Sequence, residues 1–142
     1  MNMFHVHPAN PRDDFMLLQP LDPDRGLSTY RCNDKEQKFY FCPKCGVRCF
    51  TFDGIGEIDV VDIKELADDN DGKREVWRAK WDGEDQTRPY LSVNGTTIDI
   101  RDDLDLRVLT EEKKVQYFDG RSGPEEKEKE ARWDRPHYGG SY

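Results

Sequence analysis

The residues best suited to chemistry lie in the stretch FYFCPKCGVRCF, residues 39–50, which holds three of the chain's four cysteines. Cys42 and Cys45 are separated by two residues, so their thiolates can converge on one zinc ion. Gly46 follows directly and permits a tight turn, here called the knuckle, that directs backbone N–H groups at the sulfur atoms. The spacing therefore predicts a zinc knuckle.

Two other interpretations of this cysteine pair remain open. A redox pair of the thioredoxin type would open a helix after a strand within a βαβ unit. The residues that follow, VRCFTF (47–52), are β-prone instead, and the sequence shows no such unit. The cysteines could also be ordinary buried thiols, because free cysteine behaves as a small apolar residue. The zinc knuckle is the favoured interpretation of the three.

A structural zinc takes four ligands, of which the knuckle supplies two. Cys32 and Cys49 are the obvious candidates for the other two. Cys49 falls on a β-prone stretch, where it is better explained as a small core residue, and Cys32 is better explained as a half-exposed thiol. His5 and His7 lie two residues apart, hence on one face of a strand, and form another candidate pair, although such a pair near a terminus is usually incidental. Spacing alone leaves the second half of the site open.

The composition indicates one domain with a thin core. The chain has 142 residues, 35% of them apolar and 37% charged, whereas globular proteins average about 45–50% apolar and about 25% charged residues. A core this poor in apolar residues usually needs an additional link, and a bound metal is one such link. The composition thus supports the zinc interpretation.

Charge and hydropathy exclude several classes of partner. The net charge of −8 argues against nucleic acid, because phosphate binding needs clustered Lys and Arg. No apolar run approaches the roughly 20 residues of a membrane span, and the N-terminal residues do not form a signal sequence. We therefore expect a cytosolic or nuclear protein without nucleic-acid or membrane partners. Thiols stay reduced there, so the cysteines suggest metal binding or catalysis before disulfides.

The pattern of elements is mainly β. Short stretches rich in Thr, Tyr, Phe and Val alternate with turn residues, and we expect strands at 4–7, 27–32, 37–41 and 47–52. The expected core comes from the aromatic and β-branched residues of these and later stretches: Phe39, Phe41, Val47, Val93, Ile98 and Ile100.

Two charged segments are expected to lie outside the core. Residues 67–88 are mostly charged and read as an exposed insertion, or as a short helix with Trp77 and Trp81 on one face. Residues 121–142 form a highly charged tail that we expect to be partly disordered. The expected domain is therefore 1–120, with the insertion inside it.

Four stretches together resemble a known family. PRDDFMLLQP (11–20), the hairpin and knuckle of 27–50, YLSVNGTTIDIRDDLDL (90–106) and VQYFDG (115–120) are similar to the later two-thirds of one domain. That domain belongs to the glutathione-dependent formaldehyde-activating enzyme (GFA) family and is shared with centromere protein V. The ending at 132–142 is similar to fungal members.

The resemblance implies a zinc-stapled antiparallel β-tent with two zinc sites. Cys42 and Cys45 match the later cysteine pair of the family's structural site. The earlier pair and the catalytic cluster precede PRDDF in the family, and this chain begins with MNMFHVHPAN instead. The domain is therefore expected to be incomplete at its N-terminus. Asn94 matches the family's Val-Asn strand and is a candidate for binding glutathione or a thiol adduct in the cleft.

The resemblance also implies a reaction class, a carbon–sulfur lyase that acts on a glutathione–aldehyde adduct. Because the ligands of a catalytic zinc are missing, the chain as it stands is expected to be inactive. The first alternative is a non-catalytic zinc-binding or interaction module. The second is an active enzyme whose upstream residues the sequence does not include.

Overall fold

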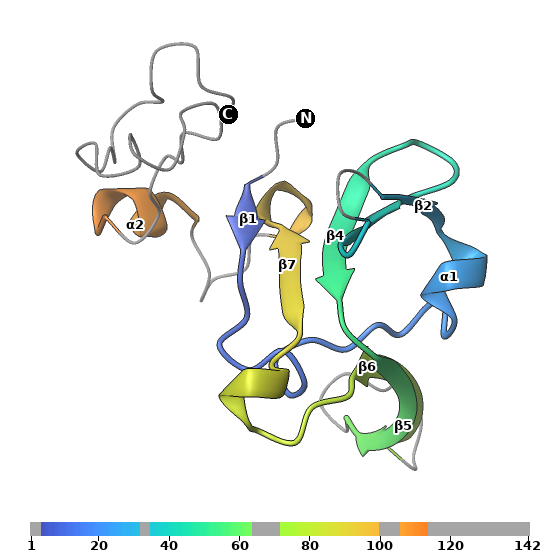
Figure 1. Cartoon of the computed structure of the whole chain (residues 1–142). Helices are drawn as coiled ribbons and strands as arrows, with labels where there is room; N and C mark the ends of the chain where they lie inside the picture. Colours follow the sequence, from blue (N-terminus) through green and yellow to red (C-terminus); the bar gives the residue numbers. More distant parts are fainter. Residues whose placement is uncertain (1–3, 32–34, 64–71, 100–105, 114–142) are drawn as a thin grey trace. The chain divides into compact units, whose positions relative to one another are not determined.

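The computed structural model describes residues 4–31, 35–63, 72–99 and 106–113 (Figure 1). The chain divides into two compact units, His5–Asn94 in one, and Met1–Phe4 with Gly95–Tyr142 in the other. Every described strand lies in the first unit, which also contains the knuckle. No helix within the described residues is both long and apolar enough to cross a membrane.

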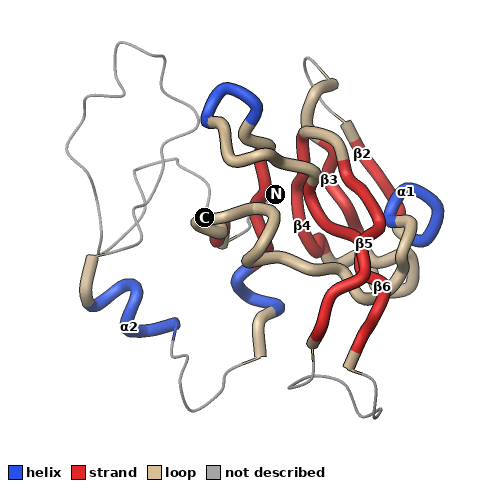
Figure 2. Tube along the Cα trace, turned by 90° about the horizontal axis from the view of Figure 1, so that it is seen from below, coloured by secondary structure: helices blue, strands red, loops and turns tan. Residues whose placement is uncertain are grey.

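The first unit contains two antiparallel sheets. The larger sheet has five strands in the order β1-β7-β4-β3-β2, and the smaller sheet is the hairpin of β5 and β6 (Figure 2). The mainly β architecture predicted from the sequence is therefore confirmed. The strands are β1 (His5–Val6), β2 (Ser28–Tyr30), β3 (Lys38–Phe41), β4 (Arg48–Asp53), β5 (Gly56–Asp62), β6 (Lys73–Ala79) and β7 (Tyr90–Asn94).

The described helices are short. In α1 (Pro23–Gly26), Pro23 occupies the first turn and the Asp22 side chain accepts hydrogen bonds from the N–H groups of Asp24 and Arg25. These are the usual start signals of a helix, and they act here over a single turn. The remaining helices are η1 (Asp85–Thr87), η2 (Gly95–Thr97) and α2 (Leu106–Glu111).

Strand pairing in the large sheet follows the local sequence. β2 and β3 form the expected antiparallel hairpin, and β3 then pairs with β4, with Tyr40 opposite Phe50. β4 pairs on its other side with β7, whose outer neighbour is β1. The two strands on either side of the cysteine turn are thus direct neighbours.

An aromatic cluster forms the core between the sheets. The Tyr40 and Phe50 rings stack with centroids 4.5 Å apart, and the Phe52 and Trp77 rings meet edge to face at 5.0 Å. Such pairs add about 0.5–1.5 kcal/mol beyond the area they bury. The buried members of this cluster are Tyr40, Phe50, Phe52, Trp77, Ala79 and Leu91.

The predicted core was largely wrong. Side chains alternate between the faces of a strand, and it is Tyr40, 1% exposed, that faces the core, so Phe39 and Phe41 lie on the opposite face and are only half-buried. The Arg48 guanidinium covers the Phe39 ring at 4.3 Å. Val47 is exposed. Val93 and Ile98 are half-buried, and Ile100 lies outside the described residues.

The expectation of an exposed segment at 67–88 also needs correction. Residues 73–79 form β6, which pairs with β5 along its whole length, and Val76 and Trp77 are buried. The main chain of Trp77 also pairs with Leu17, through N···O distances of 2.8 and 3.0 Å. Trp77 is therefore a strand residue and not part of a helix. Residues 67–71, like the predicted tail 121–142, lie outside the described residues.

Gly56 makes the burial of the Trp77 indole possible. The two residues lie on one face of the β5–β6 hairpin, and a Cβ atom at position 56 would lie 2.2 Å from the Trp77 ring. Any side chain at position 56 would therefore displace the indole. The absence of a side chain on β5 lets an aromatic residue of β6 reach the core.

We predict that Trp77→Ala lowers the free energy of unfolding by about 3–5 kcal/mol, the usual cost of truncating a buried tryptophan. Ile58→Ala, on the same hairpin at a position 56% exposed, should cost less than about 1 kcal/mol. Urea unfolding followed by far-UV circular dichroism measures both values. Equal losses would mean that Trp77 does not anchor the hairpin.

Candidate metal site

The cysteine turn joins β3 to β4. Residues 43–45 form the turn, and no helix begins at Pro43. The N–H of Cys42 donates to the carbonyl oxygen of Val47 at 2.8 Å, and the N–H of Gly46 donates to that of Cys42 at 2.9 Å. Gly46 has a φ of 73°, in the left-handed region that glycine adopts without steric cost. The predicted tight turn is thus present between two paired strands.

The surroundings of Cys42 favour its thiolate. Its pKa is lowered, first by the backbone N–H groups of Cys45 and Lys44 and then by the Cys45 side chain. The thiolate is the form that binds a metal. The turn thus places both cysteines between two paired strands, with the Cys42 thiolate stabilised by its surroundings.

The remaining cysteines were predicted as further ligands. Cys49 lies on β4 and is half-buried, with its sulfur 3.7 Å from the Val47 carbonyl oxygen. Its burial raises its pKa, and negative charge on Cys42 raises it further. Cys32 lies outside the described residues. Within the described residues, no group of three or more His, Cys, Asp or Glu side chains is arranged to hold a metal.

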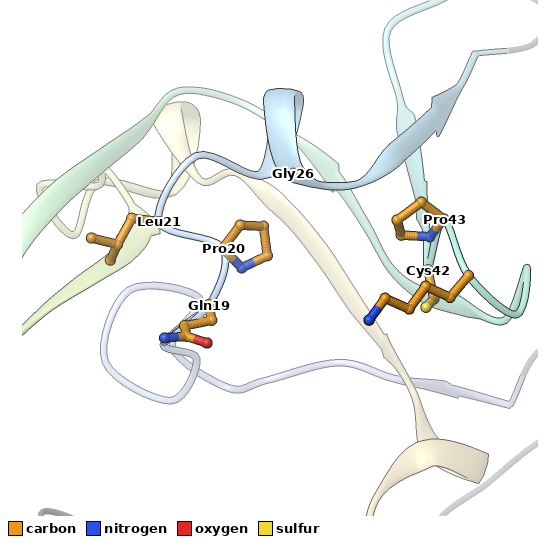
Figure 3. A pocket seen from close by; sticks show the side chains of 7 residues that line it. Gln19, Pro20, Leu21, Gly26, Cys42 and Pro43 are labelled. Atoms are coloured by element: carbon orange, nitrogen blue, oxygen red, sulfur yellow. The ribbon is translucent and has the colours of Figure 1, made fainter.

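An open groove lies beside the knuckle (Figure 3), with a volume of about 690 Å³. Pro43 and the Cys42 sulfur lie on one side of it, and Gln19 and Pro20 on the other. Sequence reasoning did not find this groove, because its two sides are more than twenty residues apart in the chain. The residues that line it are Gln19, Pro20, Leu21, Gly26, Cys42, Pro43 and Lys44.

Asn94 lies at the end of β7 and is 5% exposed. Its side-chain amide donates to the carbonyl oxygen of Arg48 at 2.8 Å. This bond fixes the first residue of β4 directly after the knuckle. Asn94 is not among the described residues that line the groove. Its observed contact is therefore structural, and its role in binding a ligand stays a prediction.

Polar side chains that sequence reasoning did not single out lie on the face of the large sheet opposite the core. Thr51 and Ser92 are fully buried there. The Arg48 guanidinium donates to the Thr51 hydroxyl, and Nδ1 of His5 lies 2.9 Å from the Ser92 hydroxyl. Burial is the main cause that lowers the pKa of His5, followed by the charges of Arg48 and His7. The face opposite the core thus combines these polar side chains with the half-buried Phe39 and Phe41.

A scan against family models, a search of curated proteins and a search of solved structures found no match to this chain. The site and its chemistry therefore rest on the geometry of the chain itself.

We predict that, in the metal-free protein, iodoacetamide alkylates Cys42 faster than Cys49 at neutral pH. The thiolate is the reactive form, and the pKa is lowered at Cys42 but raised at Cys49. The rate at Cys42 should therefore level off at a lower pH than the rate at Cys49. Peptide mass spectrometry after timed alkylation at several pH values measures both rates. A faster reaction at Cys49 would contradict the hydrogen-bond pattern of the knuckle.

Proposed function

We propose that the chain is a zinc-binding protein of the GFA type, with Cys42 and Cys45 as two thiolate ligands of a structural zinc. The observation that carries this proposal is the closed turn between β3 and β4, which holds both cysteines and is fixed by the Cys42–Val47 and Gly46–Cys42 main-chain bonds; the N–H groups of Cys45 and Lys44 lower the pKa of Cys42 there. Such donors offset the charge that accumulates when several thiolates share one zinc ion. We further propose that the antiparallel sheets correspond to the family's β-tent.

The donor set fits zinc in its chemistry. Zinc binds cysteine thiolates at about 2.3 Å in tetrahedral structural sites, and the knuckle presents two thiols in mutual hydrogen-bond contact. The further ligands of the tetrahedron are proposed to include Cys49 or Cys32. When bound, zinc would link the β3–β4 turn to another part of the chain and stabilise a fold that is poor in apolar residues.

The groove beside the knuckle supports a thiol compound as ligand. Its volume of about 690 Å³ lies within the range of about 300–1,000 Å³ typical of small-molecule sites. Leu21, Pro20 and Pro43 offer apolar contact, while Lys44 offers an ammonium group that can pair with a carboxylate. A glutathione–aldehyde adduct has two carboxylates, either of which could pair with the Lys44 ammonium group. By resemblance, the activity class of such a protein is a carbon–sulfur lyase.

A non-catalytic zinc-binding or interaction module is the second candidate function. The ligand count favours it, because the described residues bring no group of three or more His, Cys, Asp or Glu side chains together to hold a metal. A catalytic zinc needs three fixed protein ligands and one open position. Beyond the knuckle, the 142-residue sequence offers only Cys32 and Cys49 as further thiolates.

We predict that the purified chain binds Co²⁺, as a spectroscopic substitute for zinc, with thiolate-to-cobalt absorption bands. Cys42→Ser and Cys45→Ser should each weaken binding by at least about tenfold, because each removes a ligand. Lys44→Ala is the matched control, since it alters the same turn without removing a sulfur atom. Absorption titration and competition with Zn²⁺ give the affinities. Unchanged binding in both cysteine variants would contradict the knuckle as a metal site.

We predict that the zinc-loaded chain does not accelerate adduct formation between glutathione and formaldehyde. Without three fixed ligands and an open position, no zinc is held where it could polarise the carbonyl oxygen. The reaction is followed by NMR, with buffer containing the same zinc concentration as control. Zinc-dependent turnover that Cys32→Ser or Cys49→Ser abolishes would overturn this expectation and make those cysteines catalytic ligands.

A further inference from the structure

The pair His5 and His7 is a feature that the proposed zinc knuckle does not use. His5 lies on β1, the edge strand of the five-stranded sheet, and His7 follows directly after the end of that strand; both residues are exposed. Their rings lie nearly parallel, with an interplanar angle of 14° and centroids 6.1 Å apart. Spacing alone would make this pair incidental. Its contacts with the neighbouring strand β7 give it a defined chemistry.

The ring of His7 is fixed in one tautomer by the main chain. Its Nδ1 lies 3.1 Å from the carbonyl oxygen of Leu91. A carbonyl oxygen only accepts hydrogen bonds, so Nδ1 must carry the proton and donate it. The neutral ring then has an unprotonated Nε2 whose lone pair is available. Tyr90 contacts the same ring edge to face at 5.3 Å and restricts its rotation further.

The ring of His5 also has a partner on β7, a side-chain hydroxyl that allows either tautomer. Its Nδ1 lies 2.9 Å from the hydroxyl of Ser92, which is fully buried. A hydroxyl can accept as well as donate, so Ser92 is compatible with a proton on Nδ1 and a bare Nε2. Histidines that bind metals usually donate their other ring N–H to a carbonyl or hydroxyl group in this manner, which orients the ring toward the ion.

We propose that His5 and His7 form a surface chelate for a divalent transition-metal ion, with water completing the coordination shell. The juxtaposition that carries this proposal is that of two neighbouring rings, His7 with an unprotonated Nε2 and His5 able to adopt the same tautomer. Imidazole nitrogens bind such ions at about 2.0–2.1 Å, so tetrahedral coordination would bring the ring centroids to about 5 Å. The observed centroid separation of 6.1 Å is about 1 Å longer than such a chelate requires.

The site is independent of the knuckle and should differ from it in metal preference. The affinity of imidazole for divalent ions is highest for Cu²⁺ and is higher for Ni²⁺ than for Co²⁺. Thiolates select softer ions and zinc. Ni²⁺ is the suitable probe, because Cu²⁺ oxidises free thiols. In the full chain carrying both Cys42→Ser and Cys45→Ser, the knuckle cannot compete for Ni²⁺. Failure of the zinc proposal and failure of the histidine proposal can therefore be distinguished.

The first experiment titrates Ni²⁺ into this background and follows the histidine ring signals by NMR. His5 and His7 should broaden together and before His137, the third histidine of the chain. His5→Gln and His7→Gln should each weaken Ni²⁺ binding at least about tenfold, because either change converts a chelate to a single ligand. His137→Gln is the matched control and should leave the affinity unchanged. Retained affinity in either single variant, or an equal loss in the control, would overturn the chelate.

A second measurement needs no substitution and stays informative if a variant does not fold. Long-range proton–nitrogen NMR of the metal-free chain reports which ring nitrogen of each histidine carries the proton. His7 should be in the form with the proton on Nδ1, as its bond to the Leu91 carbonyl requires. A proton on Nε2 of His7 would remove the lone pair on which the proposal depends and would refute it.

Discussion

The pairing of β3 with β4 is the constraint on which the rest of the first unit depends. Tyr40 and Phe50 stand opposite one another across this pair, and their stacked rings form the centre of the aromatic core. The same two strands enter and leave the knuckle, so the separation of the cysteines is set by the ladder that the core stabilises. Core packing and metal-site geometry are therefore consequences of one strand pair.

Residues on the core face of β3 also position one wall of the groove beside the knuckle. The Tyr40 hydroxyl donates to Asp24 at 2.8 Å, and Lys38 pairs with the same carboxylate at 2.7 Å. Desolvation disfavours the charged form of Asp24, but these two donors outweigh it and lower its pKa. The bonds attach α1 to β3, and the segment around α1 supplies the groove wall opposite Pro43. A buried tyrosine thus positions a surface site through one carboxylate.

The opposite face of the large sheet has a different chemistry. Thr51 and Ser92 are buried there without a large apolar cluster, and their hydroxyl groups are hydrogen-bonded to Arg48 and His5. Buried polar groups are costly unless they are paired, so these contacts hold the side chains of β1 and β4 in fixed orientations. Both proposed metal sites depend on neighbouring groups that act on the proposed ligands. At the knuckle these are the backbone N–H groups that lower the pKa of Cys42, and at the histidine rings they are hydrogen-bond partners on β7.

Local patterns in the sequence determined most of the strands and the knuckle, and tertiary contacts decided which residues are buried. Turn residues and β-branched or aromatic runs were sufficient to predict the β2–β3 hairpin, β4 and the tight turn at Gly46, because each depends on residues within a few positions of one another. The run Phe39-Tyr40-Phe41 is apolar on both faces, so its alternation could not say which face is inside. Tyr40 was selected by the aromatic cluster that it joins through Phe50, which in turn contacts the distant Trp77 on β6. Trp77 was hidden in a charged segment for the same reason: its burial depends on Gly56 and Leu17, which only the folded chain brings to it. The tautomer of His7 likewise follows from a carbonyl group on β7, more than eighty residues away in the sequence, and no local pattern can encode it.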